Sequence, residues 1–277
     1  MPVRWGLTFV DLYDAGIAAL LGTVEGITEF LPISSTGHLI LLDDLLGFQG
    51  PPGHVFEVVI QLGAILGVCW VYRERLLQLA TRPLMPRNRH MLLLLVLGFL
   101  PAAVIGFLAH GFIKTVLFNP WVVSIALIVG GVAIIVIERL VTGDRFKEID
   151  AVPGSVGLKV GFCQALAMIP GVSRSGATIM GARVLGLSRS AAAEFSFLLA
   201  IPTMFAATGY DLYKNAAQID SHGMALVLIG FICALVTAVL TVRWLIGFVS
   251  SHTFSGFGWY RIALGSLMIV LLSFGWG

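Results

Sequence analysis

The chain has 277 residues, of which 58% are hydrophobic and only 12% are charged. Charged residues make up about 25% of an ordinary soluble domain, so this composition excludes that class and predicts an integral membrane protein. The formal net charge of +2 comes from few charges of both signs, which argues against a nucleic-acid-binding surface.

The first apolar run covers residues 12–31 and carries two glutamates. Glu25 and Glu29 are four residues apart, so a helix places them on one face, about one turn from each other. Each carboxylate costs roughly 2.5 to 3.5 kcal/mol at the centre of a bilayer, and something must offset that cost. A divalent cation, Mg²⁺ or Ca²⁺, would do so, because both ions prefer oxygen ligands. The alternative is a pair of structural glutamates that reach the membrane interface near a helix end.

A turn rich in hydroxyl groups follows these carboxylates. After Pro32 and Ile33 it continues with Ser34, Ser35, Thr36, Gly37 and His38. Backbone N–H groups at the start of a helix, with hydroxyl donors beside them, form an anion site. An imidazole at such a site is able to attack phosphorus directly or to shuttle a proton for an attacking water. The simpler interpretations are that the hydroxyls cap a helix and that the histidine is a buried core residue.

Apolar runs of two lengths make up most of the chain. A helix needs roughly 20 residues to cross about 30 Å of hydrocarbon. The clearest full spans are residues 55–72, 91–110, 120–137, 192–213, 224–244 and 259–276. The shorter or broken runs are residues 12–31, 39–46, 156–169 and 176–187. Broken runs at matching places in two halves predict re-entrant helices that line a polar cavity, because unpaired backbone is not tolerated against lipid.

These runs predict an all-α polytopic membrane protein with about six full transmembrane helices and two re-entrant segments. Trp259 and Tyr260 lie near the start of the last span, where we expect an aromatic belt at the membrane interface. The three cysteines, Cys69, Cys163 and Cys233, are far apart in apolar runs without metal-binding spacing, so we interpret them as free packing residues.

Basic residues are concentrated in two connecting segments. Residues 73–90 contain one acid, Glu74, and five arginines: Arg73, Arg75, Arg82, Arg87 and Arg89. A second basic segment follows two spans later and contains Arg139, Arg145 and Lys147. The positive-inside rule predicts that both segments are cytoplasmic. The turn at residues 34–38 has no Lys or Arg nearby, and we expect it to open to the outer side.

Residues 164–178 resemble a diverged copy of the first motif. Fifteen positions separate Gly22 from Gly37, and fifteen separate Gly161 from Gly176. This register aligns residues 34–37 with residues 173–176. With the charge placement, it predicts an inverted repeat of residues 12–138 and 156–276 within one membrane domain, residues 1–277.

The second copy adds the positive charge that the first one lacks. Arg174 lies between Ser173 and Ser175 after a Pro-Gly turn, and Thr178 follows on the same turn of the expected helix. A guanidinium binds phosphate oxygens in a bidentate manner and offsets the charge that develops during phosphoryl transfer. The alternative is an arginine that reaches to the lipid headgroups.

Together these motifs resemble the bacterial undecaprenyl-diphosphatase family, the bacitracin-resistance phosphatases. The resemblance extends over essentially the whole chain, including Phe56-Glu57 and Gln61. It is carried by Glu25-x-x-x-Glu29, Pro32-x-Ser34-Ser35-x-Gly37-His38 and Pro170-Gly171-x-Ser173-Arg174-Ser175-x-x-Thr178.

The resemblance implies hydrolysis of undecaprenyl diphosphate to undecaprenyl phosphate and inorganic phosphate. This reaction recycles the lipid carrier for peptidoglycan and other envelope polymers and confers bacitracin resistance. It also implies a multi-pass protein of the bacterial inner membrane, a site open to the periplasmic or outer side, and a divalent cation.

The same resemblance assigns roles to residues. Glu25 and Glu29 become the metal-binding or base pair, and His38 the nucleophile or acid/base. Glu57 is a weaker candidate that would act through its neighbours. The polar site residues and the diphosphate clamp are Ser34, Ser35, Thr36, Ser173, Arg174, Ser175 and Thr178.

Two other functions compete with this interpretation. A transporter or flippase of a phosphorylated lipid or anion would use the same repeat and anion site without breaking a bond. A type-2 phosphatidic acid phosphatase also has a Ser-Gly-His element, but its Lys-x6-Arg-Pro and later His-x3-Asp patterns are absent from this sequence. The expected partners are the lipid substrate and the bilayer, without nucleic acid, and a homodimer is left open.

Overall fold

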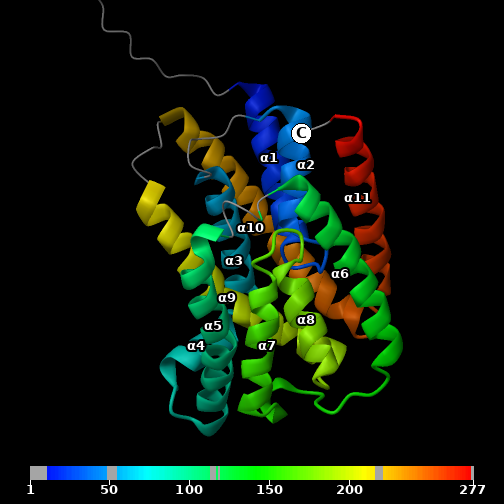
Figure 1. The fold of residues 1–277 in the computed structure, drawn as a ribbon. Coiled ribbons are helices and arrows are strands. Elements are labelled where there is room, and N and C mark those ends of the chain that lie inside the picture. The colour runs from blue at the N-terminus through cyan, green and yellow to red at the C-terminus, as the bar shows by residue number, and fades with distance from the viewer. Residues whose placement is uncertain (1–10, 49–54, 113–116, 118, 216–220, 276–277) are drawn as a thin grey trace, which may run out of the picture.

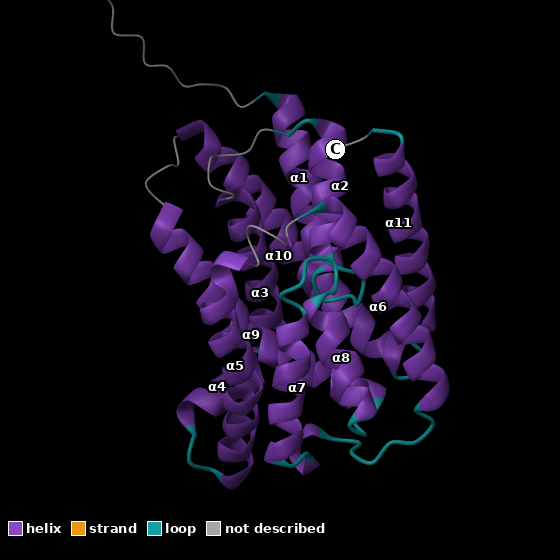
Figure 2. Cartoon of the chain, viewed as in Figure 1, coloured by secondary structure: helices purple, strands orange, loops and turns teal. Residues whose placement is uncertain are grey.

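The computed structural model describes residues 11–48, 55–112, 117, 119–215 and 221–275. Within these ranges the regular structure is helical, as Figures 1 and 2 show. The expected all-α class is therefore confirmed. Trp276, where the last predicted span ends, lies outside the described residues.

The long helices are the candidate membrane spans. In the described part of the chain, five helices are long and apolar enough to cross a membrane. They are α5 (Pro86–Phe112), α6 (Pro120–Leu140), α9 (Arg189–Asn215), α10 (Ser221–Val249) and α11 (Ser255–Ser273). A bent pair, α3 (Val55–Val71) and α4 (Arg73–Thr81), turns by 78° and makes a sixth if it counts as one span.

Two shorter helix pairs are broken where the sequence predicts breaks. The first pair is α1 (Leu12–Thr28) and α2 (Ser35–Leu46), and the second is α7 (Gly154–Leu166) and α8 (Arg174–Val184). Proline lacks the N–H group that a helix interior needs, and Pro32 and Pro170 lie in the two connecting loops. Figure 2 shows loop segments at mid-height among the helices, where the chain leaves and re-enters helical structure.

The helices pack closely because glycines let their backbones approach. Helix α10 lies along α3 and α1, while α11 lies along α6 and α5 along α7. At Gly22 of α1, an added Cβ would lie 2.1 Å from the carbonyl oxygen of Gly230 in α10. This contact sets the position of α1, the helix that carries both glutamates of the first motif.

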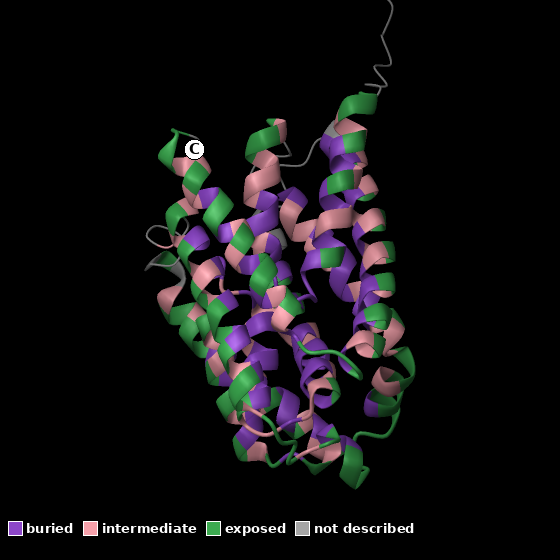
Figure 3. Cartoon of the chain, turned by 90° about the vertical axis from the view of Figure 1, so that its right-hand side faces the viewer, coloured by how far each residue is buried: buried purple, intermediate pink, exposed green. Residues whose placement is uncertain are grey.

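Large apolar side chains remain exposed on the outer faces of the helices. Phe107 and Val129 are 82% and 61% exposed, on α5 and α6. Figure 3 shows buried residues concentrated inside the bundle and exposed ones on its periphery. Such extensive apolar exposure fits a surface that contacts lipid.

The two basic segments lie at the same end of the bundle. Figure 1 shows α4 and the loop after α6 together at the bottom of the view. Asp150 joins the segments, since its carboxylate accepts from Arg75 at 2.9 Å and pairs with Arg87. Arg183 and Asp144 form a further ion pair of 2.6 Å. These contacts tie the loop after α6 to three helices.

Candidate active site

The two broken segments restart their helices with the same local structure. Ser34 and Ser173 are the N-caps of α2 and α8, with φ of 71° and 75°. Their hydroxyl oxygens accept from the N–H groups of Gly37 at 3.4 Å and Gly176 at 3.1 Å. Positive φ is unfavourable for serine and is typical of functional sites. The matching caps agree with the alignment of residues 34–37 with residues 173–176.

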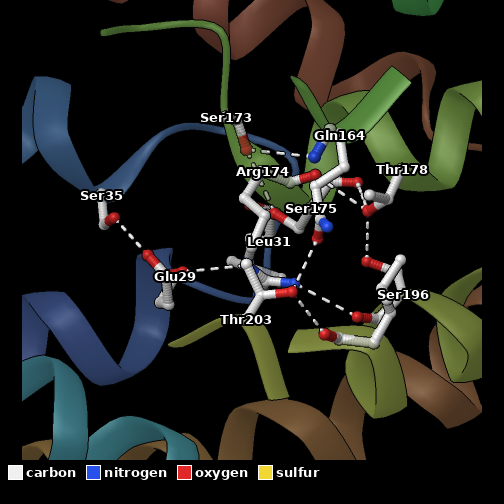
Figure 4. Close-up of polar contacts among 12 residues, drawn as sticks. Glu29, Leu31, Ser35, Gln164, Ser173, Arg174, Ser175, Thr178, Ser196 and Thr203 are labelled. Carbon is white, nitrogen blue, oxygen red and sulfur yellow. Dashed lines mark hydrogen bonds and ion pairs between the residues drawn. The ribbon is translucent and has the colours of Figure 1, made fainter. Parts of the chain in front are cut away.

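Glu29 joins the two segments. Its Oε2 accepts from the hydroxyl of Ser35 at 2.5 Å, and its Oε1 lies 3.3 Å from Nε of Arg174 (Figure 4). The side chains of Glu29 and Arg174 are only 7% and 12% exposed. The structure therefore places the arginine of the second motif directly beside a carboxylate of the first.

Arg174 keeps part of its guanidinium available. Nη1 donates to the carbonyl oxygen of Ser196 at 3.1 Å, and the group lies 5.8 Å from the ring centroid of Phe30. Nη2 is buried without a hydrogen-bond partner in the described part of the chain. A buried donor without a partner is costly, so this nitrogen is a natural contact for an oxygen of a bound anion.

Glu25 is the second buried carboxylate. It is 2% exposed, and its Oε1 has no hydrogen-bond partner among the described residues. It lies within electrostatic range of Glu29, Arg174 and Glu57. Glu25 thus belongs to the same buried electrostatic cluster as Glu29 and Arg174, and Glu57 is close enough to influence its charge.

The donor set at these glutamates fits a cation shared with substrate. Among the described residues, no group of three His, Cys, Asp or Glu side chains is arranged to hold a metal ion. Mg²⁺ commonly takes only one or two protein carboxylates and completes its shell with water and substrate phosphates. Oε1 of Glu25 is buried and has no hydrogen-bond partner among the described residues. It therefore suits a cation that is shared between one or two carboxylates and the substrate.

The remaining hydroxyl groups of the second motif tie the site together. Ser175 donates to the carbonyl oxygen of Leu31 at 2.8 Å, and its oxygen lies 3.1 Å from that of Ser173. Thr178 and Ser196 pair at 2.6 Å between their hydroxyl oxygens. Ser196 on α9 was not expected from the sequence, since one serine in an apolar run gives no local signal. Figure 4 shows this network beside Arg174.

Two residues of the first motif, Thr36 and His38, make no hydrogen bond to Glu29 or Arg174 in the described part of the chain. Thr36 is half-buried, and no hydrogen bond joins its side chain to another described residue. His38 is hydrogen-bonded through its ring nitrogens to Ser34 and Tyr260, and the described residues show no direct bond from it to Glu29. The imidazole is thus close to the carboxylates in sequence, but a different pair of groups holds it.

The adjacent residues Tyr260 and Arg261 were missed as site residues. The hydroxyl of Tyr260, which was expected at the membrane interface, lies 2.6 Å from Nε2 of His38. Arg261 is fully buried and donates to five backbone carbonyl oxygens, those of Pro32, Ala126, Leu127, Gly171 and Val172. An arginine inside an apolar span was the available signal, because such residues face the interior of a helix bundle.

An apolar cavity of about 600 Å³ borders His38 and Tyr260. Its walls come from α1, α2, α10 and α11 and include the side chains of Ile27, Leu41, Leu42, Trp244, Phe248 and Phe257. Large aliphatic and aromatic side chains predominate. A cavity of this composition suits a hydrocarbon ligand.

Comparison with known proteins agrees with these motifs. Residues 18–267 match the family described as Bacitracin resistance protein BacA. "Undecaprenyl-diphosphatase 2" of Paramagnetospirillum magneticum is 56% identical over 255 residues, which cover 92% of this chain and 98% of the relative. "Undecaprenyl-diphosphatase" of Aromatoleum aromaticum is 53% identical over 261 residues, 94% of this chain and 95% of the relative. The protein of that name in Cereibacter sphaeroides is 50% identical over 258 residues, with 92% and 96% covered.

Proposed function

Since the chain belongs to the bacitracin resistance protein BacA family, we propose that it is an undecaprenyl-diphosphatase that yields undecaprenyl phosphate and inorganic phosphate. The observation that carries this proposal is the buried contact between Arg174 and Glu29 at the junction of two broken helical segments. Within the described ranges, Nη2 of Arg174 has no hydrogen-bond partner. A guanidinium of this kind near two carboxylates in an apolar bundle suits a diphosphate group on a lipid.

The polar site binds and orients the diphosphate. Nη2 of Arg174 donates to a phosphate oxygen, while the N-termini of α2 and α8 add favourable partial positive charge. Phosphoryl transfer depends chiefly on positioning and on stabilising the charge of the transition state. Burial strengthens both effects, because the low dielectric of the site screens charges weakly.

Glu25 and Glu29 would hold a divalent cation, Mg²⁺ or Ca²⁺, and the cation would neutralise charge on the diphosphate. Oε1 of Glu25 supports this assignment, since it is buried and no described residue bonds to it. We expect EDTA to inhibit phosphate release and added Mg²⁺ or Ca²⁺ to restore it. Activity that is unaffected by EDTA would contradict the assignment.

His38 acts as the nucleophile or as the acid/base, and its ring borders the apolar cavity. The prenyl chain of the substrate occupies this cavity, which leads the diphosphate end of the lipid toward the polar site. The hydroxyl groups of Ser173, Ser175 and Thr178 keep the loops in place around the polar site.

In the full proposal, the two broken segments enter from opposite faces as an inverted repeat, and the site opens to the periplasmic side of the bacterial inner membrane. The matching caps of Ser34 and Ser173 support a common origin of the segments. The gathering of the two basic segments at one end supports the orientation, because that end is then cytoplasmic.

Purified protein in detergent, supplied with undecaprenyl diphosphate, tests the function. We expect equal amounts of undecaprenyl phosphate and inorganic phosphate, and no release from an Arg174→Ala variant. The competing transporter hypothesis predicts that the lipid crosses the bilayer of proteoliposomes while its diphosphate stays intact. Lipid movement without phosphate release would therefore reject the phosphatase.

A further inference from the structure

The contacts of His38 identify which of its ring nitrogens is chemically available. Nδ1 lies 2.7 Å from the carbonyl oxygen of Ser34. A carbonyl oxygen only accepts hydrogen bonds, so Nδ1 carries a proton and donates it. In the neutral ring the lone pair is then on Nε2, which lies 2.6 Å from the hydroxyl of Tyr260. Tyr260 therefore donates to the one nitrogen of His38 that is able to act as a nucleophile or base.

Tyr260 reaches His38 from a helix whose position is firmly set. The two rings are parallel within 4°, with centroids 5.5 Å apart. The next residue of α11, Arg261, donates to carbonyl oxygens of both broken segments, including those of Pro32 and Gly171. Because Arg261 holds α11 against these loops, it also sets the place of the Tyr260 hydroxyl relative to His38.

The contact lies on the wall of the apolar cavity. His38 and Tyr260 both line it, and the hydroxyl of Thr28, another polar lining group, donates to the carbonyl oxygen of Val24 at 2.7 Å. The pairing of His38 with Tyr260 is therefore a polar contact at a boundary that is otherwise largely hydrocarbon. A lipid in the cavity would bring its polar end past this contact.

We propose that Tyr260 is a positioning residue that fixes the ring of His38 at the cavity wall through Nε2 and releases that nitrogen when the diphosphate arrives. This inference rests on the proposed function, in which the Nε2 lone pair either attacks phosphorus or accepts a proton from water. Both roles need a ring of fixed orientation, in which the single lone pair of Nε2 passes from the Tyr260 hydroxyl to the substrate. The hydroxyl of Tyr260 and the carbonyl of Ser34 provide this by holding the imidazole from its two sides.

Tyr260→Phe removes the hydroxyl and keeps the stacked ring. We expect kcat to fall about tenfold, because one hydrogen bond of ordinary strength is lost. KM should stay within about twofold of the wild-type value, because substrate binding is retained. Tyr13→Phe, which removes an exposed hydroxyl at the start of α1, is the matched control and should keep wild-type kinetics. An unchanged kcat in Tyr260→Phe would overturn the proposal, as would a loss confined to KM or to thermal stability.

A second measurement does not depend on turnover. In protein labelled with ¹⁵N-histidine, with the signals of residue 38 assigned by their loss in His38→Ala, Tyr260→Phe should shift the Nε2 resonance and leave that of Nδ1 in place. An unmoved Nε2 resonance would refute the contact. If wild-type protein releases no phosphate, the proposed function fails, whereas the resonances still report whether Tyr260 holds His38.

Discussion

At the scale of single residues, the site depends on the buried ion pair of Arg174 and Glu29. Both charges are withdrawn from water, which costs free energy that their mutual attraction only partly offsets. Such a pair is a poor choice for stability alone. In this chain it holds a guanidinium in place while Nη2 has no hydrogen-bond partner among the described residues, an arrangement that suits an anion.

Replacing Arg174 by lysine should preserve the positive charge but lower the catalytic rate. Lysine lacks the planar fork that reaches Glu29, Ser196 and the substrate together. We expect kcat to fall on the order of 10²- to 10³-fold, the usual effect of losing one preorganised donor. The fall in kcat is measured as phosphate release by the purified variant, whose thermal stability should equal that of the wild type.

The control for this change is Arg139→Lys, at an exposed arginine in the last turn of α6. It should retain the wild-type rate. Arg174→Ala and Glu29→Ala should each abolish turnover while the protein still inserts into the membrane. A near-normal rate in either of these two variants would show that the ion pair is not part of the reaction site.

At the scale of helices and loops, α11 organises the site although it carries none of the motif residues. Proline breaks leave carbonyl groups in both loops without intrahelical partners. Arg261 supplies donors for three of them, at Pro32, Gly171 and Val172, and also for two in α6. One side chain thereby fastens both broken segments to a continuous helix.

Arg261→Gln should destabilise the protein by about 3 kcal/mol, about 1 kcal/mol for each loop carbonyl that loses its donor. We expect a lower unfolding temperature in detergent, together with reduced activity, because both loops lose their common support. Arg243→Gln removes an exposed arginine of α10 and should change neither quantity. Equal unfolding temperatures for the two variants would exclude this role for Arg261.

The packing of α1 offers a second test at this scale. Gly22→Ala places a Cβ 2.1 Å from the carbonyl oxygen of Gly230, and backbone atoms cannot yield as a flexible side chain would. We expect a loss of about 1 to 3 kcal/mol in stability and displacement of Glu25, one turn further along. Gly16→Ala on the same helix meets no atom within 4 Å and should stabilise by up to about 1 kcal/mol, because alanine favours a helix interior over glycine. The comparison is made by thermal unfolding, and a neutral Gly22→Ala would argue against the tight α1–α10 contact.

At the scale of the whole molecule, charge separates the two ends of the bundle. The arginines of α4 and the loop after α6 lie at one end, while α11 finishes at the other (Figure 1). Asp150 binds Arg75 of α4 and Arg87 at the start of α5, so the basic end is also held together by ion pairs. Under the positive-inside rule this asymmetry sets the orientation in the membrane.

Cysteine labelling in oriented membrane vesicles tests that orientation. In a background with the three native cysteines replaced by serine, Arg82→Cys should react with an impermeant reagent only from the cytoplasmic side. Ser273→Cys, at the end of α11, should react only from the outer side. Both positions are exposed. The opposite pattern would reverse the proposed topology and place the site on the other face.

Features that depend on neighbouring residues follow from the local sequence. Long apolar runs became helices, the loops containing Pro32 and Pro170 became breaks, and Ser34 and Ser173 became caps, because backbone geometry and hydrogen bonding act locally. The sequence also identifies Glu29 and Arg174 as candidate site residues, since charged groups within apolar runs are costly and usually have a function.

Which of these groups meet depends on how the helices pack in three dimensions. Tyr260 holds His38 across 222 positions of the chain, and Arg261 reaches Pro32 across 229. No local pattern encodes such pairs, because they depend on how α11 packs against the two broken segments. The place of each functional group along the chain is recognised from local sequence, whereas the group that it contacts is set by helix packing.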